Sequence, residues 1–133
     1  MASAFLDSNV VLYLMSADGS KAERAESLLN ASPVVSVQVL NEVANVSRRK
    51  LSLSWNEVAD LLAAVRAHCT VEPLTVATHE QGIALAREFS LSLYDAMIVA
   101  SALAANCTTL YSEDMQHGLV VDRRLKIRNP FAR

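Results

Sequence analysis

The chain contains very little glycine. Of its 133 residues only Gly19, Gly82 and Gly118 are glycine, and no two of them are close together. A P-loop and a GxGxxG dinucleotide-binding loop both need clustered glycines, because the backbone must approach a phosphate group closely. The sequence therefore excludes both kinds of nucleotide-binding loop.

Cysteine is also scarce. Cys69 and Cys107 form no CxxC motif, and none of the three histidines stands at ligand spacing from either of them. A zinc site built from Cys and His is therefore not predicted. We expect both cysteines to be small core residues of a protein kept in the reducing cytoplasm.

The chain lacks a strong net charge and any clear membrane segment. Its formal net charge of −2 gives no bulk attraction to nucleic acid, and 5% aromatic residues do not favour extensive base stacking. No basic segment precedes Asp7, so we do not expect a signal peptide. One uncharged stretch, residues 96–112, is shorter than the roughly 20 residues of a membrane-spanning helix. We expect a cytoplasmic protein without a membrane partner.

Hydrophobic residues are abundant at 52%, and charged residues make up 20%, which suits one packed domain over residues 1–133. Short apolar runs alternate with longer segments of helical periodicity. Predicted strands cover residues 4–6, 34–36, 70–74, 109–111 and 119–121. Predicted helices cover residues 9–16, 21–30, 37–50, 54–68, 76–89 and 95–105. Strands separated by helices indicate a parallel sheet covered on both faces. The predicted fold class is α/β, a three-layer α/β/α sandwich with a small, mostly parallel sheet.

Three acidic residues follow predicted strands. Asp7 comes directly after the first strand, Asp114 follows strand 109–111 closely, and Glu42 lies early in the helix that follows strand 34–36. The carboxyl ends of parallel strands share one edge of a sheet, where ligands bind, so topology brings these three together. Asp95 opens a predicted helix. It joins them only if that helix points its N-terminus at the same edge, which the pattern does not show.

Each acid has an ordinary explanation when it is taken alone. Asp7 suits a helix N-cap, Asp95 suits a capping box with Ser92, and Glu42 and Asp114 suit solvated positions. Taken together they would repel, by about 4 kcal/mol for two carboxylates about 4 Å apart at an effective dielectric constant of about 20. No Lys or Arg is adjacent to Asp7, Glu42 or Asp95 in the sequence. Either the acids are far apart or a cation holds them, and an all-oxygen site favours Mg²⁺ or Mn²⁺.

Four segments together resemble the acidic motifs of the PIN domain. They are FLDSNV at 5–10, LNEV at 40–43, YDAMIVA at 94–100 and YSEDMQHG at 111–118, in matching order and spacing. The closing IRNPF at 127–131 is similar to the tail of VapC-type toxins, the ribonuclease halves of bacterial toxin–antitoxin pairs. The likeness extends over essentially the whole chain.

The resemblance implies a PIN-like fold and a metal-dependent endoribonuclease that acts as the toxin of such a pair. It assigns catalysis and the binding of Mg²⁺ or Mn²⁺ to four acids, namely Asp7, Glu42, Asp95 and Asp114. It gives supporting roles to Asn9 and Ser112, and the fourth motif offers Glu113 as a second acid. The implied partners are an RNA substrate, a cognate antitoxin protein and a second copy in a homodimer.

Basic residues in two places are candidates for holding RNA. Arg48, Arg49 and Lys50 end the predicted helix 37–50, and Arg123 and Arg124 belong to a basic C-terminal segment. Contact with phosphates would make binding weaken with salt. The ordinary alternative is a set of charges that complement a helix C-terminus, followed by a solvated tail.

Two other function classes fit the sequence less well. A haloacid-dehalogenase-like phosphoryl-transfer enzyme would need Asp-x-Asp, whereas this chain has Asp7-Ser8-Asn9, and a receiver domain would need paired acids after its first strand. A non-catalytic RNA- or protein-binding module of the same PIN fold is the main alternative. The four intact acids argue against it, and a Mg²⁺- or Mn²⁺-dependent cleavage assay decides between the two.

Overall fold

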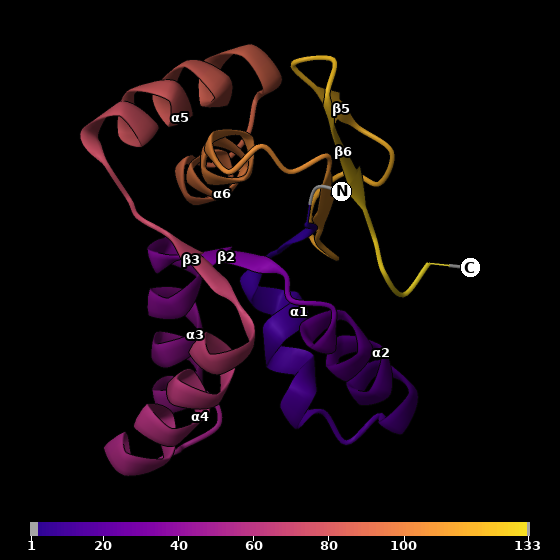
Figure 1. Ribbon diagram of the computed structural model, residues 1–133. Helices are drawn as coiled ribbons and strands as arrows, with labels where there is room; N and C mark the ends of the chain where they lie inside the picture. The colour runs from indigo at the N-terminus through magenta and orange to yellow at the C-terminus, as the bar shows by residue number, and fades with distance from the viewer. Residues whose placement is uncertain (1–2, 133) are drawn as a thin grey trace.

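The computed structural model describes residues 3–132, and its strands form one six-stranded sheet (Figure 1). The order across the sheet is β3-β2-β1-β4-β6-β5. All neighbours pair in parallel except β5, which runs antiparallel to β6. The strands are β1 (Phe5–Leu6), β2 (Val34–Ser36), β3 (Thr70–Glu72), β4 (Thr109–Tyr111), β5 (Val120–Val121) and β6 (Leu125–Arg128).

Helices connect these strands. They are α1 (Ser8–Leu12), the 3₁₀ helix η1 (Tyr13–Met15), α2 (Gly19–Asn30), α3 (Val37–Arg49), α4 (Trp55–His68), α5 (Val76–Phe89) and α6 (Leu93–Ala104). Side-chain oxygens cap the helix N-termini, as Ser36 does for α3 and Ser92 for α6. The capping box predicted from Ser54 and Glu57 is present at the start of α4.

The sheet lies between two layers of helices. In Figure 1, α5 and α6 lie on one side of β1, β2 and β3, and α1 to α4 lie on the other. Fully buried side chains such as Phe5, Val35 and Leu110 fill the centre. Residues 96–103 of α6 are all buried, as their uninterrupted hydrophobic character predicts. The predicted three-layer α/β fold with a mostly parallel sheet is confirmed.

The C-terminal segment differs from the prediction. Residues 125–128, interpreted from the sequence as part of a basic tail, form strand β6 beside β4. Leu125 and Ile127 are buried while Lys126 and Arg128 are exposed, so the segment alternates with the period of a strand. The strand is only four residues long and two of its residues are charged. In the sequence these charges made the segment resemble a solvated tail.

Smaller differences concern element boundaries. The helix predicted over residues 9–16 is α1 followed by the 3₁₀ helix η1, and β3 ends before Pro73. Strand β3 lies at the edge of the sheet, as predicted for a strand that includes Pro73, although Pro73 itself follows the strand.

The remaining expectations concern cysteine and membranes. Cys107 is buried, Cys69 is partly buried, and both are free thiols. None of the helices within residues 3–132 combines the length and hydrophobicity needed to span a bilayer.

Candidate active site

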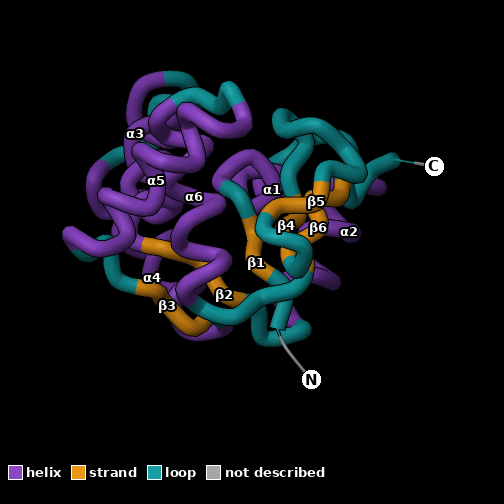
Figure 2. The backbone as a smooth tube through the Cα atoms, turned by 90° about the horizontal axis from the view of Figure 1, so that it is seen from above, coloured by secondary structure: helices purple, strands orange, loops and turns teal. Residues whose placement is uncertain are grey.

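The site forms where the strand order changes direction. From β1 the chain continues outward through β2 to β3 on one side, while β4 takes the place on the other side of β1. In such sheets ligands bind beyond the carboxyl ends of the strands at this switch point. Strands β1 and β4 lie side by side (Figure 2), and the Asp7 amide donates a hydrogen bond to the Tyr111 carbonyl at 3.0 Å. Residues far apart in the sequence therefore meet here.

Asp7 lies at the centre of a hydrogen-bonded network. The Ser112 hydroxyl donates to Asp7 Oδ2 at 2.8 Å, although the two residues are 105 positions apart. The Asn9 side-chain amide donates to the same oxygen at 3.3 Å, and the Ser8 backbone amide donates to Oδ1 at 2.7 Å. Asp7 thus caps α1, as its ordinary interpretation predicts, and Ser112 and Asn9 hold its side chain. Their supporting roles at a metal site stay a prediction.

The electrostatics around Asp7 oppose its negative charge. Only 3% of Asp7 is exposed, and burial raises its pKa to about 6 despite hydrogen bonds from Ser112 and Ser8 that lower it. The charges of Asp95 and Asp114 raise that pKa further. Within residues 3–132 the ion pairs are Lys21–Glu113 and Arg124–Asp122, so none of the four predicted acids is paired with a cation.

Glu42 on α3 belongs to the same electrostatic environment. Burial raises its pKa to about 7, and the charges of Asp7 and Asp95 also raise it. Its Oε2 atom is buried and has no hydrogen-bond partner. A buried carboxylate oxygen without a partner is unusual. Hydrogen bonds with the Gln38 and Ser8 side chains lower the pKa of Glu42, but burial outweighs them.

Asp95 lies in the first turn of α6. Its backbone amide donates to the Ser92 hydroxyl at 3.2 Å, so Ser92 caps the helix. Within residues 3–132 the Asp95 side chain makes no reciprocal bond to the Ser92 amide, so the predicted capping box is only half formed. Burial raises the pKa of Asp95, and the charge of Asp114 adds to this effect. Because Asp95 also acts on Asp7 and Glu42, the N-terminus of α6 faces the site. The sequence had left this orientation open.

A pocket of ≈580 Å³ opens over this edge of the sheet. Glu42 and Asp114 line it, and Asp7 is buried behind Ser8 and Asn9, which also line it. Amide, hydroxyl and carboxylate groups therefore surround the opening. The lining residues are Ser8, Asn9, Leu12, Gln38, Asn41, Glu42, Asn45, Val46, Lys50, Tyr94 and Asp114.

The donors suit a hard divalent cation in their chemistry. Among the residues that the structure describes, no three His, Cys, Asp or Glu side chains are gathered into a ready-made metal site. The four acids nevertheless offer only oxygen ligands, act on one another electrostatically, and include the partnerless Oε2 of Glu42. These are the properties of oxygen donors that fit Mg²⁺ or Mn²⁺.

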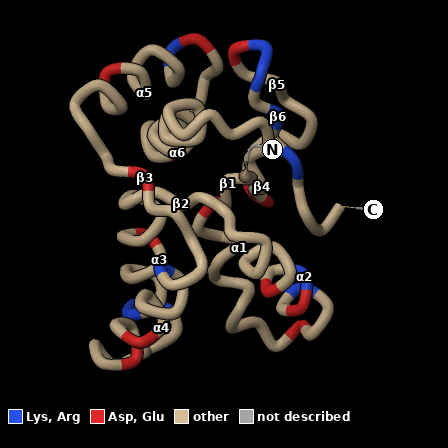
Figure 3. The backbone as a smooth tube through the Cα atoms, in the orientation of Figure 1, with Lys and Arg blue, Asp and Glu red and all other residues tan. Residues whose placement is uncertain are grey.

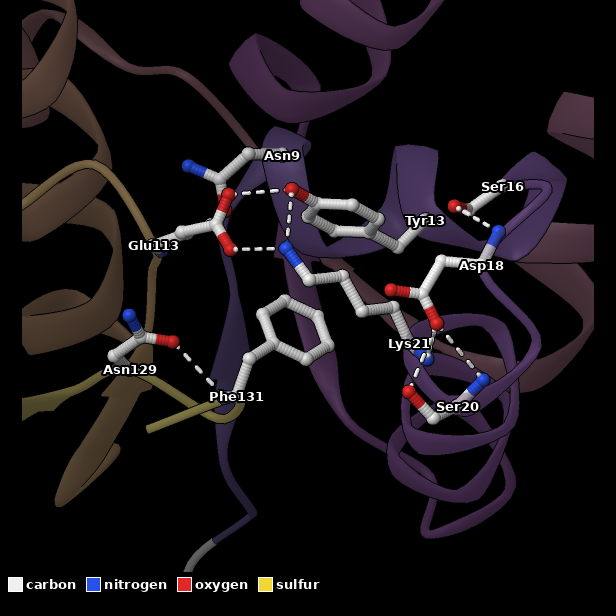
Figure 4. Close-up of polar contacts among 9 residues, drawn as sticks. All are labelled: Asn9, Tyr13, Ser16, Asp18, Ser20, Lys21, Glu113, Asn129 and Phe131. Atoms are coloured by element: carbon white, nitrogen blue, oxygen red, sulfur yellow. Dashed lines mark hydrogen bonds and ion pairs between the residues drawn. The ribbon is translucent and has the colours of Figure 1, made fainter. Parts of the chain in front are cut away.

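Glu113 lies apart from these four acids. Its side chain accepts hydrogen bonds from the Tyr13 hydroxyl at Oε1 and from Lys21 Nζ at Oε2, the latter at 3.1 Å (Figure 4). The bond from Tyr13, followed by the bond and charge of Lys21, lowers the pKa of Glu113. The two adjacent acids of the fourth motif therefore have different surroundings.

The basic end of α3 is only partly directed at the pocket. Lys50 lines the pocket, whereas Arg48 donates to the Leu53 carbonyl at 2.9 Å and packs over the Trp55 ring at 4.5 Å. Arg49 is exposed and does not line the pocket. Lys50 is thus the member of this predicted group that the structure brings to the acids.

Arg123 and Arg124 lie elsewhere. They form the turn between β5 and β6 (Figure 3), next to the amino end of β6 and thus at the sheet edge opposite the pocket. The Arg124 guanidinium contacts Asn106 and the Leu103 carbonyl and pairs with Asp122 at 3.6 Å. Their predicted contact with RNA stays a prediction, and the structure does not bring them to the acidic pocket.

Several residues around the site had no assignment from the sequence. Tyr94 lines the pocket with 62% of its surface exposed, and its position directly before Asp95 is the signal that could have found it. Tyr13 follows Asn9 by four positions, one helical turn, which places the two on one side of α1 and η1. Lys21 carries no such signal, because its partner Glu113 is 92 residues away.

Residues 4–119 match the family model of the PIN domain. The chain belongs to the PIN domain family. The resemblance seen in its four acidic motifs is thereby confirmed, and the acids of this PIN domain lie at the switch point of its sheet. A comparison with curated proteins gives no match.

Solved structures of a VapC toxin and of toxin–antitoxin complexes share the fold of this PIN domain. VapC20 of Mycobacterium tuberculosis, described as a sarcin-ricin loop cleaving toxin, is 24% identical, with a TM-score of 0.67 over 84% of this chain and 90% of that chain. A toxin–antitoxin complex from Klebsiella pneumoniae is 20% identical, with a TM-score of 0.73 over 97% and 98% of the two chains. VapBC2 from Rickettsia felis, bound to a DNA fragment from its promoter, is 19% identical, with a TM-score of 0.69 over 95% and 97%.

Proposed function

We propose that this PIN domain is a Mg²⁺- or Mn²⁺-dependent endoribonuclease and acts as the toxin of a toxin–antitoxin pair in the cytoplasm. The observation that carries the proposal is the set of unpaired acids at the switch point. Asp7 is buried without a cation, two further acids raise its pKa, and Glu42 has a buried oxygen without a partner. Such an arrangement is unfavourable in a protein that has no use for a cation there.

The four acids Asp7, Glu42, Asp95 and Asp114 would hold the metal. A bound divalent ion would supply neutralisation of the phosphodiester charge and acidification of a water molecule. The chain itself supplies positioning: Ser112 and Asn9 both donate to Asp7 Oδ2 and fix its carboxylate.

Residues at the rim of the pocket would hold the RNA. Lys50 brings a positive charge to an otherwise acidic opening, where it can contact a phosphate. Tyr94 presents a largely exposed ring on which an unpaired base can stack. Together they favour a single-stranded or looped RNA, because a base must leave its helix to stack on a side chain.

A protein partner is supported by a second, more apolar pocket. This pocket of ≈340 Å³ borders the acidic one and shares Asn9, Leu12, Val46 and Lys50 with it. An antitoxin segment bound there would lie against the mouth of the acidic pocket and block RNA. The toxin–antitoxin complexes among the similar structures are consistent with such a partner. A homodimer stays a prediction from the family resemblance.

A cleavage assay with matched variants tests the proposal. The purified protein should cut single-stranded RNA with Mn²⁺ or Mg²⁺ and stop when EDTA is added. Asp7→Asn should abolish cleavage, while Asp60→Asn, an exposed acid on α4, should leave it unchanged. Cleavage by Asp7→Asn at the wild-type rate, or RNA binding without cleavage at any divalent concentration, would favour a non-catalytic PIN-fold module.

A further inference from the structure

Asp114 has no hydrogen bond of its own to hold it in place. It is exposed, and among residues 3–132 no side chain bonds to its carboxylate. The position of Asp114 therefore depends on how the backbone of residues 112–115 is held. Two sets of contacts hold this segment.

The first set belongs to the Asp7 network. The Ser112 hydroxyl bonds to Asp7, and the Met115 amide donates to the Ser112 hydroxyl at 3.3 Å. The Glu113 amide donates to the Asn9 side-chain oxygen at 3.1 Å. These bonds tie the segment to the N-terminus of α1.

The second set is a cluster of four side chains, which we call the clasp: Tyr13, Lys21, Glu113 and Phe131 (Figure 4). Lys21 Nζ donates to Glu113 and, at 3.2 Å, to the Tyr13 hydroxyl. The same nitrogen lies 4.6 Å from the centroid of the Tyr13 ring and 5.3 Å from that of the Phe131 ring. The two rings meet edge to face with centroids 4.6 Å apart.

The clasp joins four parts of the chain. Tyr13 comes from η1, Lys21 from α2, Glu113 from the segment after β4, and Phe131 from the end of the chain after β6. Side-chain exposures of 33% for Lys21 and 27% for Glu113 show that water only partly screens their ion pair. The phenol and the two rings restrict where Lys21 can lie, so the ion pair is held in one geometry.

We propose that Glu113 is a positioning residue: through Lys21 and Tyr13 it holds the 112–115 segment so that Asp114 faces the other acids, and it does not itself bind the metal. This inference rests on the proposed function and deepens it. With its charge paired outside the pocket, Glu113 supports the site without adding a fifth carboxylate to it. Sequence alone cannot separate this role from that of a metal ligand, because Glu113 is adjacent to Asp114.

Lys21→Met separates the two roles by the sign of its effect. It frees the Glu113 carboxylate and removes a positive charge near the site, so a metal-binding Glu113 would bind Mn²⁺ as tightly as before or more tightly. A positioning Glu113 predicts the reverse, a loss of Mn²⁺ affinity of about tenfold, since supporting residues of metal sites typically cost 10–100-fold when they are changed. Glu113→Gln should weaken binding to a similar degree, and Lys21→Arg should restore most of it.

The experiment measures Mn²⁺ binding by isothermal titration calorimetry without RNA, together with amide hydrogen exchange at residues 112–115. Lys126→Met, which removes an exposed lysine on β6, is the charge-matched control. The proposal requires weaker Mn²⁺ binding and faster exchange of these amides in Lys21→Met, and neither in Lys126→Met. Unchanged exchange in Lys21→Met would overturn it, as would a lower melting temperature with unchanged Mn²⁺ affinity.

Failure of the proposed function has a different signature. If the wild-type protein binds Mn²⁺ but cuts no RNA, the endoribonuclease proposal fails while the calorimetric comparison still decides the role of Glu113. If the wild-type protein binds no Mn²⁺, the metal-dependent function fails, and the exchange rates in Lys21→Met still show whether the clasp holds the segment.

Discussion

Two hydrogen-bonded networks around the segment after β4 each contain a carboxylate, Asp7 in one and Glu113 in the other. The two networks differ in how the negative charge of that carboxylate is compensated. Asp7 is buried, lacks a cation and has a raised pKa. Glu113, one residue beyond the Ser112 that bonds to Asp7, is partly exposed, pairs with Lys21 and has a lowered pKa. Both accept several hydrogen bonds, so hydrogen bonding does not distinguish them. The presence or absence of a compensating cation does, and it matches the different roles proposed for Asp7 and Glu113.

The largest expected difference between the two networks is in catalysis. Asp7→Asn should lower the rate of metal-dependent RNA cleavage by about 10³-fold or more, because it removes a charge that the metal needs. Glu113→Gln should lower it by only about tenfold, as expected for a positioning residue. Single-turnover cleavage assays measure both. Equal losses of cleavage rate in Asp7→Asn and Glu113→Gln would contradict the different roles proposed for these two acids.

A smaller effect is expected when the Asp7 network is weakened without removing its charge. Ser112→Ala deletes the hydroxyl that donates to Asp7 Oδ2, so cleavage should fall by about 10–100-fold. Because this hydrogen bond lowers the pKa of Asp7, the variant should also need a higher pH for half-maximal activity. A pH–rate profile checks the shift. Ser90→Ala, a change outside the site, serves as the control and should leave the profile in place.

The raised pKa of Asp7 predicts how the stability of the metal-free protein depends on pH. The pKa of Asp7 is about 6 when folded against 3.8 for an unperturbed Asp, so the folded state binds more protons between these values. The stabilisation that comes from protonated Asp7 in the folded state is fully present below about pH 4 and is lost as pH rises through about 6. Asp7→Asn should therefore stabilise the protein by about 1–2 kcal/mol at pH 8 after allowing for a weakened hydrogen bond. Urea unfolding in EDTA at pH 4.5 and pH 8 tests this: a gain that does not shrink at pH 4.5 would contradict it.

The smallest effect concerns the one predicted RNA-binding cation that lines the pocket. Lys50→Gln should weaken RNA binding a few-fold and lower the slope of log affinity against log salt by about 0.7–1, the value for one phosphate contact. Arg124→Gln is the contrast, because Arg124 lies at the opposite edge of the sheet. If Arg124→Gln changed the salt slope and Lys50→Gln did not, the RNA would be bound at the sheet edge opposite the acids.

Much of this architecture could be predicted from the sequence. The strand and helix pattern fixes the layers, and topology alone brings Asp7, Glu42 and Asp114 to one edge. Asp95 required the family resemblance, because the local pattern of residues 95–105 does not give the direction of α6 relative to the sheet. Strand β6 was missed because Lys126 and Arg128 masked the alternation of Leu125 and Ile127.

The role of Glu113 was beyond the sequence for a different reason. Its partners Tyr13 and Lys21 lie 100 and 92 residues away, and nothing near Glu113 in the chain indicates them. Charge in the sequence likewise suggested that Arg123 and Arg124 bind RNA, and only the pairing of β6 with β4 shows which edge they occupy. Long-range contacts, unlike helix periodicity, leave no local trace.

The adjacency of β1 and β4 also has a consequence for synthesis of the chain. Asp7 is translated well before Asp114, and strand β4 completes its pairing only when β6 has emerged from the ribosome. A nascent or prematurely terminated chain that stops before Ser112 holds Asp7 without the hydroxyl that orients it. The hydrogen bond between Asp7 and Ser112 therefore forms only after the 105 positions that separate them have been synthesised.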